Sequence, residues 1–391
     1  MRLYEYEGKA MFQKCGIAIP RGVLVRTDRE AQRAAIEIGK EVVIKSQILA
    51  GGRGKAGGIK TAETPENAAK VAQEMLGMDL KGYKVNSLLI EEKLDIANEL
   101  YMGITVDDEN GAPIAMISIE GGVEIEEVAK RKPGRIASTH INPLYEMRSY
   151  EAINLIRQIG LTGEALLSAS KILTRLYNVF TAYDARIVEI NPLVMTSNGA
   201  MIAADARCEI DDNSLFRHPE WQDLRIQRID NPWEREGVKA GVNYVDLDGD
   251  IALMANSAGV AMSLLDIIKD EGGHPACFLD TGGALSKERM KNGIALLLRK
   301  AKSDPRVKVI LVYTSLVFSL PDTVAGGIIE AIKEVPADVP VMLISGGGEE
   351  RRKQVHELLK DSGVKIWPSV EKGVREAIGI ARQESRNGYI C

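Results

Sequence analysis

The sequence lacks any apolar run long enough to cross a membrane, and its first residues lack the basic charge of a targeting peptide. A transmembrane helix needs about 20 mostly apolar residues, and the chain of 391 residues contains no such run. The segment 1–7 carries acids where a secretory or transit peptide would be basic. We therefore expect a cytoplasmic protein without a membrane anchor.

Cysteine and excess basic charge are also lacking. The four cysteines are Cys15, Cys208, Cys277 and Cys391. They lie far apart and form no C-x-x-C motif, so they indicate free thiols in a reducing compartment rather than a zinc site or a disulfide framework. The net charge is −5 and the pI is about 5.7. This acidic balance argues against a nucleic-acid-binding surface.

A glycine-rich segment over 50–58 contains five glycines and two cations, Arg53 and Lys55, in nine residues. It follows a predicted strand over 41–48, in which Lys45 and Gln47 point to the same side. Glycines let backbone N–H groups approach a ligand closely, and the cations supply charge. The segment therefore favours a polyphosphate site, with a flexible surface loop as the alternative.

Acidic and amide side chains recur at the ends of later predicted strands. A strand over 87–91 ends in Glu91, which suits contact with a ribose or a base. A strand over 187–194 places Glu189 and Asn191 on one face, and an Asn-Gly hairpin turn at 197–199 can bring Asp205 near them. Two oxygen ligands completed by substrate phosphates suit magnesium. An ordinary hairpin with polar faces is the alternative.

The second half has a different pattern, which fits the expectation that a chain of this length holds at least two domains. After a linker over 231–239, about five apolar strands alternate with helices, and this pattern predicts a doubly wound parallel sheet. Such sheets bind ligands at the carboxyl ends of their strands. Those ends are the segments 256–259, 280–284, 314–319 and 345–348.

Together these segments resemble the β-subunit family of succinyl-CoA synthetases, and the resemblance covers the whole chain. The matching segments are Lys45, 51–58, 120–126, 189–193, 211–217, 247–249, 256–262 and 278–283. The resemblance implies a mixed α/β and α+β architecture. An ATP-grasp domain of two lobes would occupy 1–235, and a flavodoxin-like, doubly wound CoA-ligase domain would occupy 240–391.

The resemblance also implies roles for individual residues. Lys45 and Arg53 would be the catalytic residues that hold the ATP phosphates. Asn191 and Asp205 would be the magnesium ligands, with Glu189 beside them. The implied nucleotide-binding residues are Lys45, Gly52, Arg53, Gly54, Glu91, Leu94 and Glu99, and the implied substrate-binding residues are Asn256, Val317, Phe318 and Ser319.

The implied activity is that of a nucleoside-diphosphate-forming acid–CoA ligase, with succinate as the default acid and the tricarboxylic acid cycle as its setting. The chain would bind ATP or GTP with Mg²⁺ and exchange phosphate with a histidine of a partner α subunit. None of the four histidines lies in the loops above, so we expect the phosphorylated histidine on that partner. The resemblance also implies that CoA is bound mainly by the partner. The assembly would be a heterodimer or a heterotetramer.

One loop departs from the family pattern. The family carries an asparagine-hydrophobic-Phe-Gly-Gly-Ile run whose glycine amides bind the acid, whereas this chain has Leu316 and Val317 in place of both glycines. The next loop carries Gly347 and Gly348 in place of the family's residues. Added bulk and restricted φ predict a reshaped acid pocket.

Several alternatives therefore stay open. Malate, citrate or another dicarboxylate is the alternative to succinate. A non-catalytic nucleotide-binding subunit is a second alternative, and a stand-alone carboxylate–amine ligase of the ATP-grasp type is a third, which the second domain disfavours. ATP and GTP are not distinguished, because Leu94 would contact the base through its backbone only.

Overall fold

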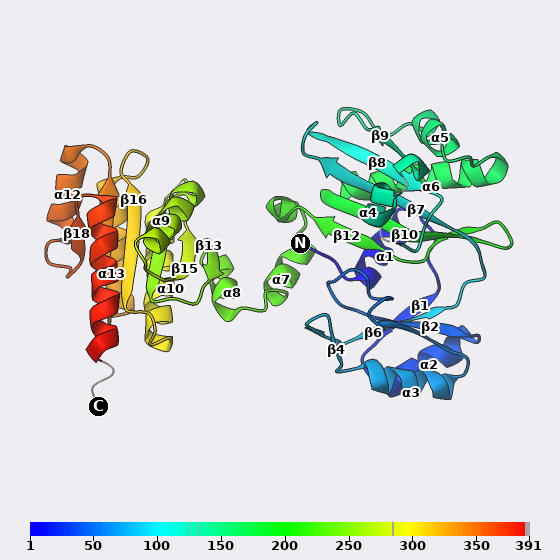
Figure 1. The fold of residues 1–391 in the computed structure, drawn as a ribbon, viewed down its shortest axis with the longest axis horizontal. Coiled ribbons are helices and arrows are strands. Elements are labelled where there is room, and N and C mark those ends of the chain that lie inside the picture. The colour runs from blue at the N-terminus through cyan, green and yellow to red at the C-terminus, as the bar shows by residue number, and fades with distance from the viewer. Residues whose placement is uncertain (124, 132, 284, 388–391) are drawn as a thin grey trace. The chain divides into compact units, whose positions relative to one another are not determined.

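The computed structural model describes residues 1–123, 125–131, 133–283 and 285–387, and the chain divides into two compact units, Met1–Trp221 and Gln222–Cys391 (Figure 1). Glu124, Ala284 and Cys391, which belong to segments considered above, lie outside the described residues. Among the described helices, none combines the length and the apolar character needed to cross a membrane.

The first lobe of unit 1 is a four-stranded antiparallel sheet packed against two helices. The strands, in order across the sheet, are β1 (Gly22–Val25), β6 (Leu88–Glu92), β2 (Val42–Ser46) and β3 (Ile59–Ala62), and the helices are α2 (Asp28–Ile38) and α3 (Pro65–Met75). Alanines of both helices pack with aliphatic side chains of β2 and β6 in one core. This core fixes β2 directly before the glycine-rich segment. A short ribbon of β4 (Asp79–Leu80) and β5 (Tyr83–Lys84) follows α3.

Local signals explain where α2 begins and ends. Thr27 caps its N-terminus, since Thr27 Oγ1 accepts a hydrogen bond from the Glu30 amide at 3.2 Å and the Glu30 carboxylate accepts one from the Thr27 amide. Gly39 ends the helix at φ +73°, in the left-handed region that glycine adopts without cost. The chain then turns directly into β2.

The second lobe of unit 1 is a larger sheet in the order β11-β10-β7-β8-β9, with β12 also paired to β10. Its strands are β7 (Ile96–Asp107), β8 (Ala112–Ser118), β9 (Ile136–His140), β10 (Ala185–Thr196), β11 (Met201–Ala203) and β12 (Arg207–Ile210). Strands β7 and β8 pair antiparallel, from Tyr101 opposite Ser118 to Asp107 opposite Ala112. The predicted hairpin at 197–199 is confirmed, with Gly199 at φ +83°.

The same lobe also contains helices. They are α1 (Glu5–Lys14), α4 (Ile125–Arg131), α5 (Ser149–Arg157) and α6 (Gly163–Ala182), with the short 3-10 helices η1 (Pro133–Arg135) and η2 (Asp212–Arg217). Buried side chains of α1, α5 and α6 share one core with β7, β8 and β10. Helix α1 therefore packs in the same core as β10, the strand that carries Glu189 and Asn191.

Unit 2 contains a six-stranded sheet in the order β13-β15-β14-β16-β17-β18 within the described residues. The strands are β13 (Asn243–Asp246), β14 (Ile251–Ala255), β15 (Pro275–Asp280), β16 (Val309–Ser315), β17 (Val341–Gly346) and β18 (Lys365–Trp367). The helices after α7 (Pro219–Gln227) are α8 (Pro232–Lys239), α9 (Ala258–Asp270), α10 (Lys287–Ser303), α11 (Pro321–Glu334), α12 (Glu349–Leu359) and α13 (Val370–Asn387).

The sheet of unit 2 is covered on both faces (Figure 1). Side chains of β14 alternate between two cores: Ala252 and Met254 pack with α10, α11 and α12, whereas Ile251, Leu253 and Ala255 pack with α9 and α13. Strands β14 to β18 run parallel. The predicted doubly wound sheet is confirmed.

Two details differ from the sequence prediction. The antiparallel edge strand β13 was not predicted, because only four residues form it and they include no apolar run. The compact units divide between Trp221 and Gln222, earlier than the predicted linker over 231–239. Helix α8 accounts for this: a Cβ on Gly237 would lie 2.5 Å from Tyr244 Cβ, so α8 packs directly on β13.

Candidate functional site

A cavity of about 800 Å³ lies in unit 1 and is lined by residues from both lobes. Its wall includes the glycine-rich segment, the end of β6, the loop before α4, β10 and the segment after β11. All nine residues predicted for nucleotide and magnesium line it, namely Lys45, Gly52, Arg53, Gly54, Glu91, Leu94, Glu99, Asn191 and Asp205. The fold thus gathers positions that lie up to 160 residues apart in the sequence.

The glycine-rich segment forms a closed loop at the end of β2. The Gly58 amide donates to the Arg53 carbonyl at 2.8 Å, and the Ser46 amide donates to the Gly58 carbonyl at 2.8 Å. A Cβ on Gly58 would lie 2.5 Å from both Leu80 Cδ2 and Ser46 Oγ. Glycine is therefore required at 58 for this close packing, and Gly52 adopts φ +68°.

The two cations of this loop have different environments. Arg53 is buried, and its guanidinium donates to both carboxylate oxygens of Asp205 at 2.9 and 3.0 Å and to the Ser46 carbonyl at 2.9 Å. It also forms an ion pair with Glu5 at 2.7 Å. The side chain of Lys55 is 62% exposed. Both cations line the cavity, but the fold buries Arg53 and leaves most of the Lys55 side chain exposed to solvent.

Lys45 lies at the end of β2 and, together with Glu5, Arg53 and Glu91, forms the floor of the cavity. Its ammonium pairs with Glu5 at 2.9 Å and with Glu91 at 2.8 Å, and it donates to the Ala204 carbonyl at 2.5 Å. Burial alone would lower the pKa of Lys45, but the carboxylates of Glu5 and Glu91 raise it above its ordinary value. Lys45 is therefore positively charged at neutral pH.

Two functional candidates were missed by the sequence analysis, Glu5 and Lys9 on α1. Both are buried. Glu5 contacts three cations, at 2.8 Å from Lys9, 2.9 Å from Lys45 and 2.7 Å from Arg53. Positions 5, 9 and 12 lie on one helical face, which Phe12 buries in the core. The sequence signal that could have found them is the presence of two charged residues on a helix face that is otherwise buried.

Glu91 lies in the same charged cluster. One carboxylate oxygen is 2.5 Å from the Lys9 ammonium, and the other is 2.8 Å from the Lys45 ammonium. Its neighbour Glu92 instead accepts from the Arg21 amide at 2.9 Å and pairs with Lys40 at 2.7 Å. Of the two acids that end β6, Glu91 therefore belongs to the floor of the cavity.

The two predicted magnesium ligands line the cavity together with Glu189. Asn191 holds the loop before α4, because its Oδ1 accepts from the Gly122 amide at 2.8 Å and its Nδ2 donates to the Val123 carbonyl at 2.9 Å. Burial raises the pKa of Glu189, which the nearby Arg207 opposes. These three residues come from β10 and the segment that follows β11.

The donor set of these residues fits Mg²⁺. A carboxylate from Asp205 and an amide oxygen from Asn191 are hard oxygen donors. Within the described part of the chain, no three His, Cys, Asp or Glu side chains form a metal-binding group. Magnesium held by one or two protein oxygens needs substrate phosphates and water to complete its shell, and the cavity has room for them.

In unit 2, Asn256 follows β14 and holds the loop after β16. Its Oδ1 accepts from the Ser315 amide at 3.1 Å, and its Nδ2 donates to Ser319 Oγ at 3.4 Å. Asn256 and Ser319 are buried, whereas Val317 is 62% and Phe318 79% exposed. The structure therefore brings two of the four predicted substrate-binding residues together and directs the other two toward solvent.

The two altered loops of unit 2 fit each other. Leu316 is fully buried in the core below α11. A Cβ on Gly347 would lie 3.1 Å from Leu316 Cβ, and Gly347 adopts φ +126°. The Arg351 guanidinium donates to the Leu316 carbonyl at 2.5 Å. The bulk of Leu316 is thus accommodated by a glycine in the neighbouring loop.

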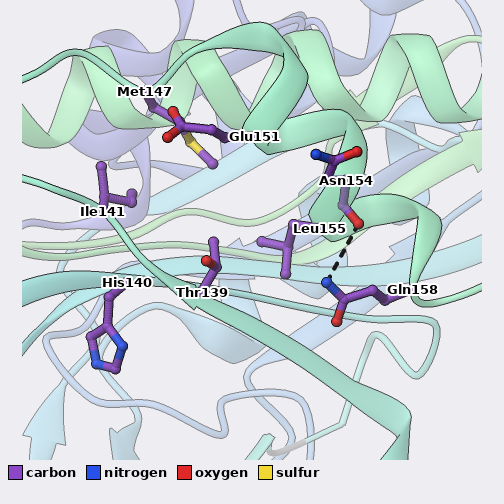
Figure 2. Close-up of a pocket in the computed structure, with 8 residues that line it drawn as sticks. All are labelled: Thr139, His140, Ile141, Met147, Glu151, Asn154, Leu155 and Gln158. Atoms are coloured by element: carbon purple, nitrogen blue, oxygen red, sulfur yellow. Dashed lines mark hydrogen bonds between the residues drawn. The ribbon is translucent and has the colours of Figure 1, made fainter.

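A second, smaller cavity of about 160 Å³ lies in unit 1 (Figure 2). Figure 2 shows that the end of β9, α5 and the chain between them contribute its lining. These residues are Thr139, His140, Ile141, Met147, Glu151, Asn154, Leu155 and Gln158. None of the predicted site residues lines it, and the His140 ring nitrogen pairs instead with Asp107 at 2.7 Å.

Two family models match the chain. An ATP-grasp domain matches residues 2–195, and a CoA-ligase domain matches residues 254–380. With the nucleotide-sized cavity in the first unit and the doubly wound sheet in the second, they define the class of this chain, a CoA ligase built on an ATP-grasp fold.

Curated relatives define the family more closely. The succinate–CoA ligase [ADP-forming] subunit beta of Pelodictyon phaeoclathratiforme is 41% identical over 389 residues, which covers 96% of this chain and 97% of the relative. The protein of the same name from Ignicoccus hospitalis is 39% identical over 383 residues, covering 98% and 100%. The chain belongs to the succinate–CoA ligase β-subunit family, and it is an acid–thiol ligase.

A solved structure shares the fold. ATP citrate lyase from Methanothrix soehngenii, solved in complex with citrate and coenzyme A, has a TM-score of 0.74 and 20% sequence identity. The match covers 97% of this chain and 99% of that chain. At this identity the likeness concerns the fold alone.

Proposed function

We propose that this chain is the nucleotide-binding β subunit of a nucleoside-diphosphate-forming acid–CoA ligase. It binds ATP with Mg²⁺ in the cavity of unit 1 and transfers phosphate to a histidine of a partner α subunit. The observation that carries the proposal is the convergence of nine predicted residues on that one cavity of about 800 Å³. This volume suits a nucleotide, since sites for small molecules measure roughly 300–1,000 Å³.

The cations of the floor have the positions that phosphate binding requires. Lys45 and Arg53 are buried and charged, so they bind phosphate oxygens in a site of low dielectric. Phosphate oxygens that approach Arg53 compete with the Asp205 carboxylate for the same guanidinium. A carboxylate released in this way is a free oxygen ligand. The same cations stabilise charge on the phosphoryl group that is transferred.

Magnesium would be held by Asp205 and Asn191. When bound, it would neutralise phosphate charge and orient the phosphates for transfer. Asn191 already fixes Gly122 and Val123 at the cavity wall. It therefore also shapes the loop that borders the nucleotide.

The phosphorylated histidine is proposed on the partner, and CoA is proposed to bind chiefly there. The four histidines of this chain are His140, His218, His274 and His356, and none of them lines the nucleotide cavity. His140 and His218 pair with Asp107 and Asp184, away from it. A phosphohistidine intermediate divides one difficult transfer into two easier ones.

Succinate is the first acid to test, and another dicarboxylate such as malate or citrate is the second candidate. One observation favours the second candidate: Val317 stands where the family's pattern has a glycine, and its side chain is 62% exposed, so an apolar group replaces a bare amide there. Leu94 lines the nucleotide cavity with an aliphatic side chain. It offers no side-chain hydrogen bond to distinguish ATP from GTP.

The test is a thioester assay on the chain purified with its partner α subunit. ATP, CoA and Mg²⁺ are supplied with succinate, malate, citrate or no acid, and both ADP and acyl-CoA are quantified. We expect acid-dependent formation of ADP and thioester in equal amounts. ADP formation without any thioester would reject the ligase activity. Turnover of succinate at ordinary efficiency would reject the hypothesis that the substrate is a different dicarboxylate.

A further inference from the structure

Helix α1 lies directly behind the phosphate-binding floor of the cavity. A Cβ on Gly8 would lie 3.1 Å from both Ala206 Cβ and Cys208 Sγ, so α1 packs closely on the segment that follows Asp205. The Leu3 amide donates to the Cys208 carbonyl at 3.0 Å. This packing holds the inward face of α1, which carries Glu5 and Lys9, against the floor.

Lys9 and Lys45 share the same three acceptors. Lys9 Nζ lies 2.8 Å from Glu5, 2.5 Å from Glu91 and 2.7 Å from the Ala204 carbonyl. Lys45 Nζ lies 2.9, 2.8 and 2.5 Å from the same three groups. Only Lys45 lines the cavity, because Lys9 is buried behind it. Each of the two carboxylates thus contacts both lysines, and only Lys45 faces the ligand.

The formal charges of this cluster are balanced. Within the described part of the chain, ion pairs join three cations, Lys9, Lys45 and Arg53, to three carboxylates, Glu5, Glu91 and Asp205. Without Lys9, two cations would face three carboxylates. The floor would then be negative and would repel phosphate. Burial lowers the pKa of Lys9, and the carboxylates of Glu5 and Glu91 in contact with its ammonium oppose this shift.

We propose that Lys9 is a positioning residue for nucleotide binding: from behind the cavity it shares Glu5 and Glu91 with Lys45, and so leaves Lys45 able to attract phosphate. The inference rests on the proposed function, because it assigns Lys9 and Glu5 to the same nucleotide site. Lys9 touches neither nucleotide nor metal. It acts through the charge and the position of Lys45.

The experiment measures Mg·ATP binding to the full-length chain by isothermal titration calorimetry. Lys9→Met removes the charge and keeps a similar length. We expect the dissociation constant to rise roughly 10- to 100-fold, as one unit charge in a partly buried site predicts. Lys14→Met on the same helix is the matched control, because Lys14 is exposed and its loss should leave the constant within about twofold.

A double variant separates charge balance from packing. Lys9→Met with Glu5→Gln returns the floor to two cations and two carboxylates, so we expect its dissociation constant to come within a few-fold of the wild-type value. A merely structural role predicts weaker binding in the double variant, which has lost more contacts. If the single variant does not fold, the double variant still gives this answer, with thermal unfolding measured in parallel.

Two results would overturn the inference. One is a folded Lys9→Met variant that binds Mg·ATP with wild-type affinity, and the other is a double variant that binds as weakly as the single one. The wild-type titration distinguishes these from failure of the proposed function. A wild-type chain that binds no Mg·ATP rejects the nucleotide site itself, whereas wild-type affinity in the folded Lys9→Met variant rejects the role of Lys9 alone.

Discussion

At the scale of single residues, the fold makes chemically similar side chains unequal. Arg53 and Lys55 stand two positions apart in the same loop, yet Arg53 is buried among Glu5, Asp205 and the Ser46 carbonyl while Lys55 is exposed. A buried, charge-assisted contact is stronger than one in solvent. The two residues should therefore differ in their importance for phosphate binding.

Arg53→Met should weaken Mg·ATP binding by roughly 100-fold or more, because it removes the guanidinium from the cavity floor. Lys55→Met should weaken it less than about fivefold, since exposed charges interact weakly. Titration calorimetry on both variants measures the difference, with thermal unfolding as the check that Arg53→Met is folded. Equal effects of the two substitutions would show that phosphate is not held at Arg53.

Stability below neutral pH should depend on Glu5. Burial opposes its charge, but Lys45, Lys9 and Arg53 hold the pKa of Glu5 well below its ordinary value. A lowered folded-state pKa adds stability above the unfolded-state pKa, and this stability is lost as the pH falls through the folded-state pKa. The unfolding free energy, measured in urea at several pH values, should fall from about pH 4.5 downward, and it should fall less steeply in Glu5→Gln. Identical slopes in both proteins would contradict this role.

The residues of the site differ in how far the sequence could predict them. Lys45, Arg53, Asn191 and Asp205 were predicted from a glycine-rich loop, a hairpin and the family resemblance, and the fold brings them to one cavity. Glu5 was not predicted, because a charge near a helix start is ordinarily solvated. Its role depends on three cations that lie 4, 40 and 48 positions away in the sequence, and only the folded chain assembles them.

At the scale of elements, neighbouring loops of unit 2 have adapted to each other. Leu316 after β16 packs against Gly347 after β17, and Asn256 after β14 holds the first of these loops at Ser315 and Ser319. The sequence predicted that Leu316 reshapes this region but placed its bulk in the acid pocket. The structure buries Leu316 in the core instead. An apolar side chain in a loop turns toward the core when a neighbouring residue leaves space for it.

Gly347→Ala should destabilise the protein by about 1–3 kcal/mol, because it adds a Cβ 3.1 Å from Leu316 and requires alanine at φ +126°. The adjacent Gly348→Ala is the matched control. No atom lies within 4 Å of a Cβ built at Gly348, and its φ of −64° suits alanine, so the expected change is within about 0.5 kcal/mol. Urea denaturation measures both, and equal stabilities would contradict the packing of Leu316 on Gly347.

At the scale of the whole molecule, the chain comprises two units with separate cores. The order of strands and helices along the chain was predictable, because glycines at the ends of elements and the periodicity of apolar residues are local sequence signals. The edge strand β13 and the division at Trp221 were not, since they depend on the packing of α8 against Tyr244. The proposed nucleotide site lies in the first unit.

Amide hydrogen exchange should show that the nucleotide binds in the first unit. Binding of Mg·ATP should slow exchange in the loop over 50–58 and in the loop before α4, because both border the cavity and ligand binding stabilises the segments it contacts. Amides in the cores of β16 and β17 serve as an internal reference. Protection confined to residues 315–320 would place the nucleotide in unit 2 and contradict the account.

Transfer of phosphate from ATP to the partner subunit tests the central claim most directly. The chain and its partner α subunit are incubated with Mg²⁺ and ATP labelled on the γ-phosphate, and the labelled residue is identified by mass spectrometry. The account predicts label on a histidine of the partner, its removal on addition of ADP, and little label when Arg53→Met replaces the wild-type chain. Absence of label on the partner, or label on a histidine of this chain, would contradict it.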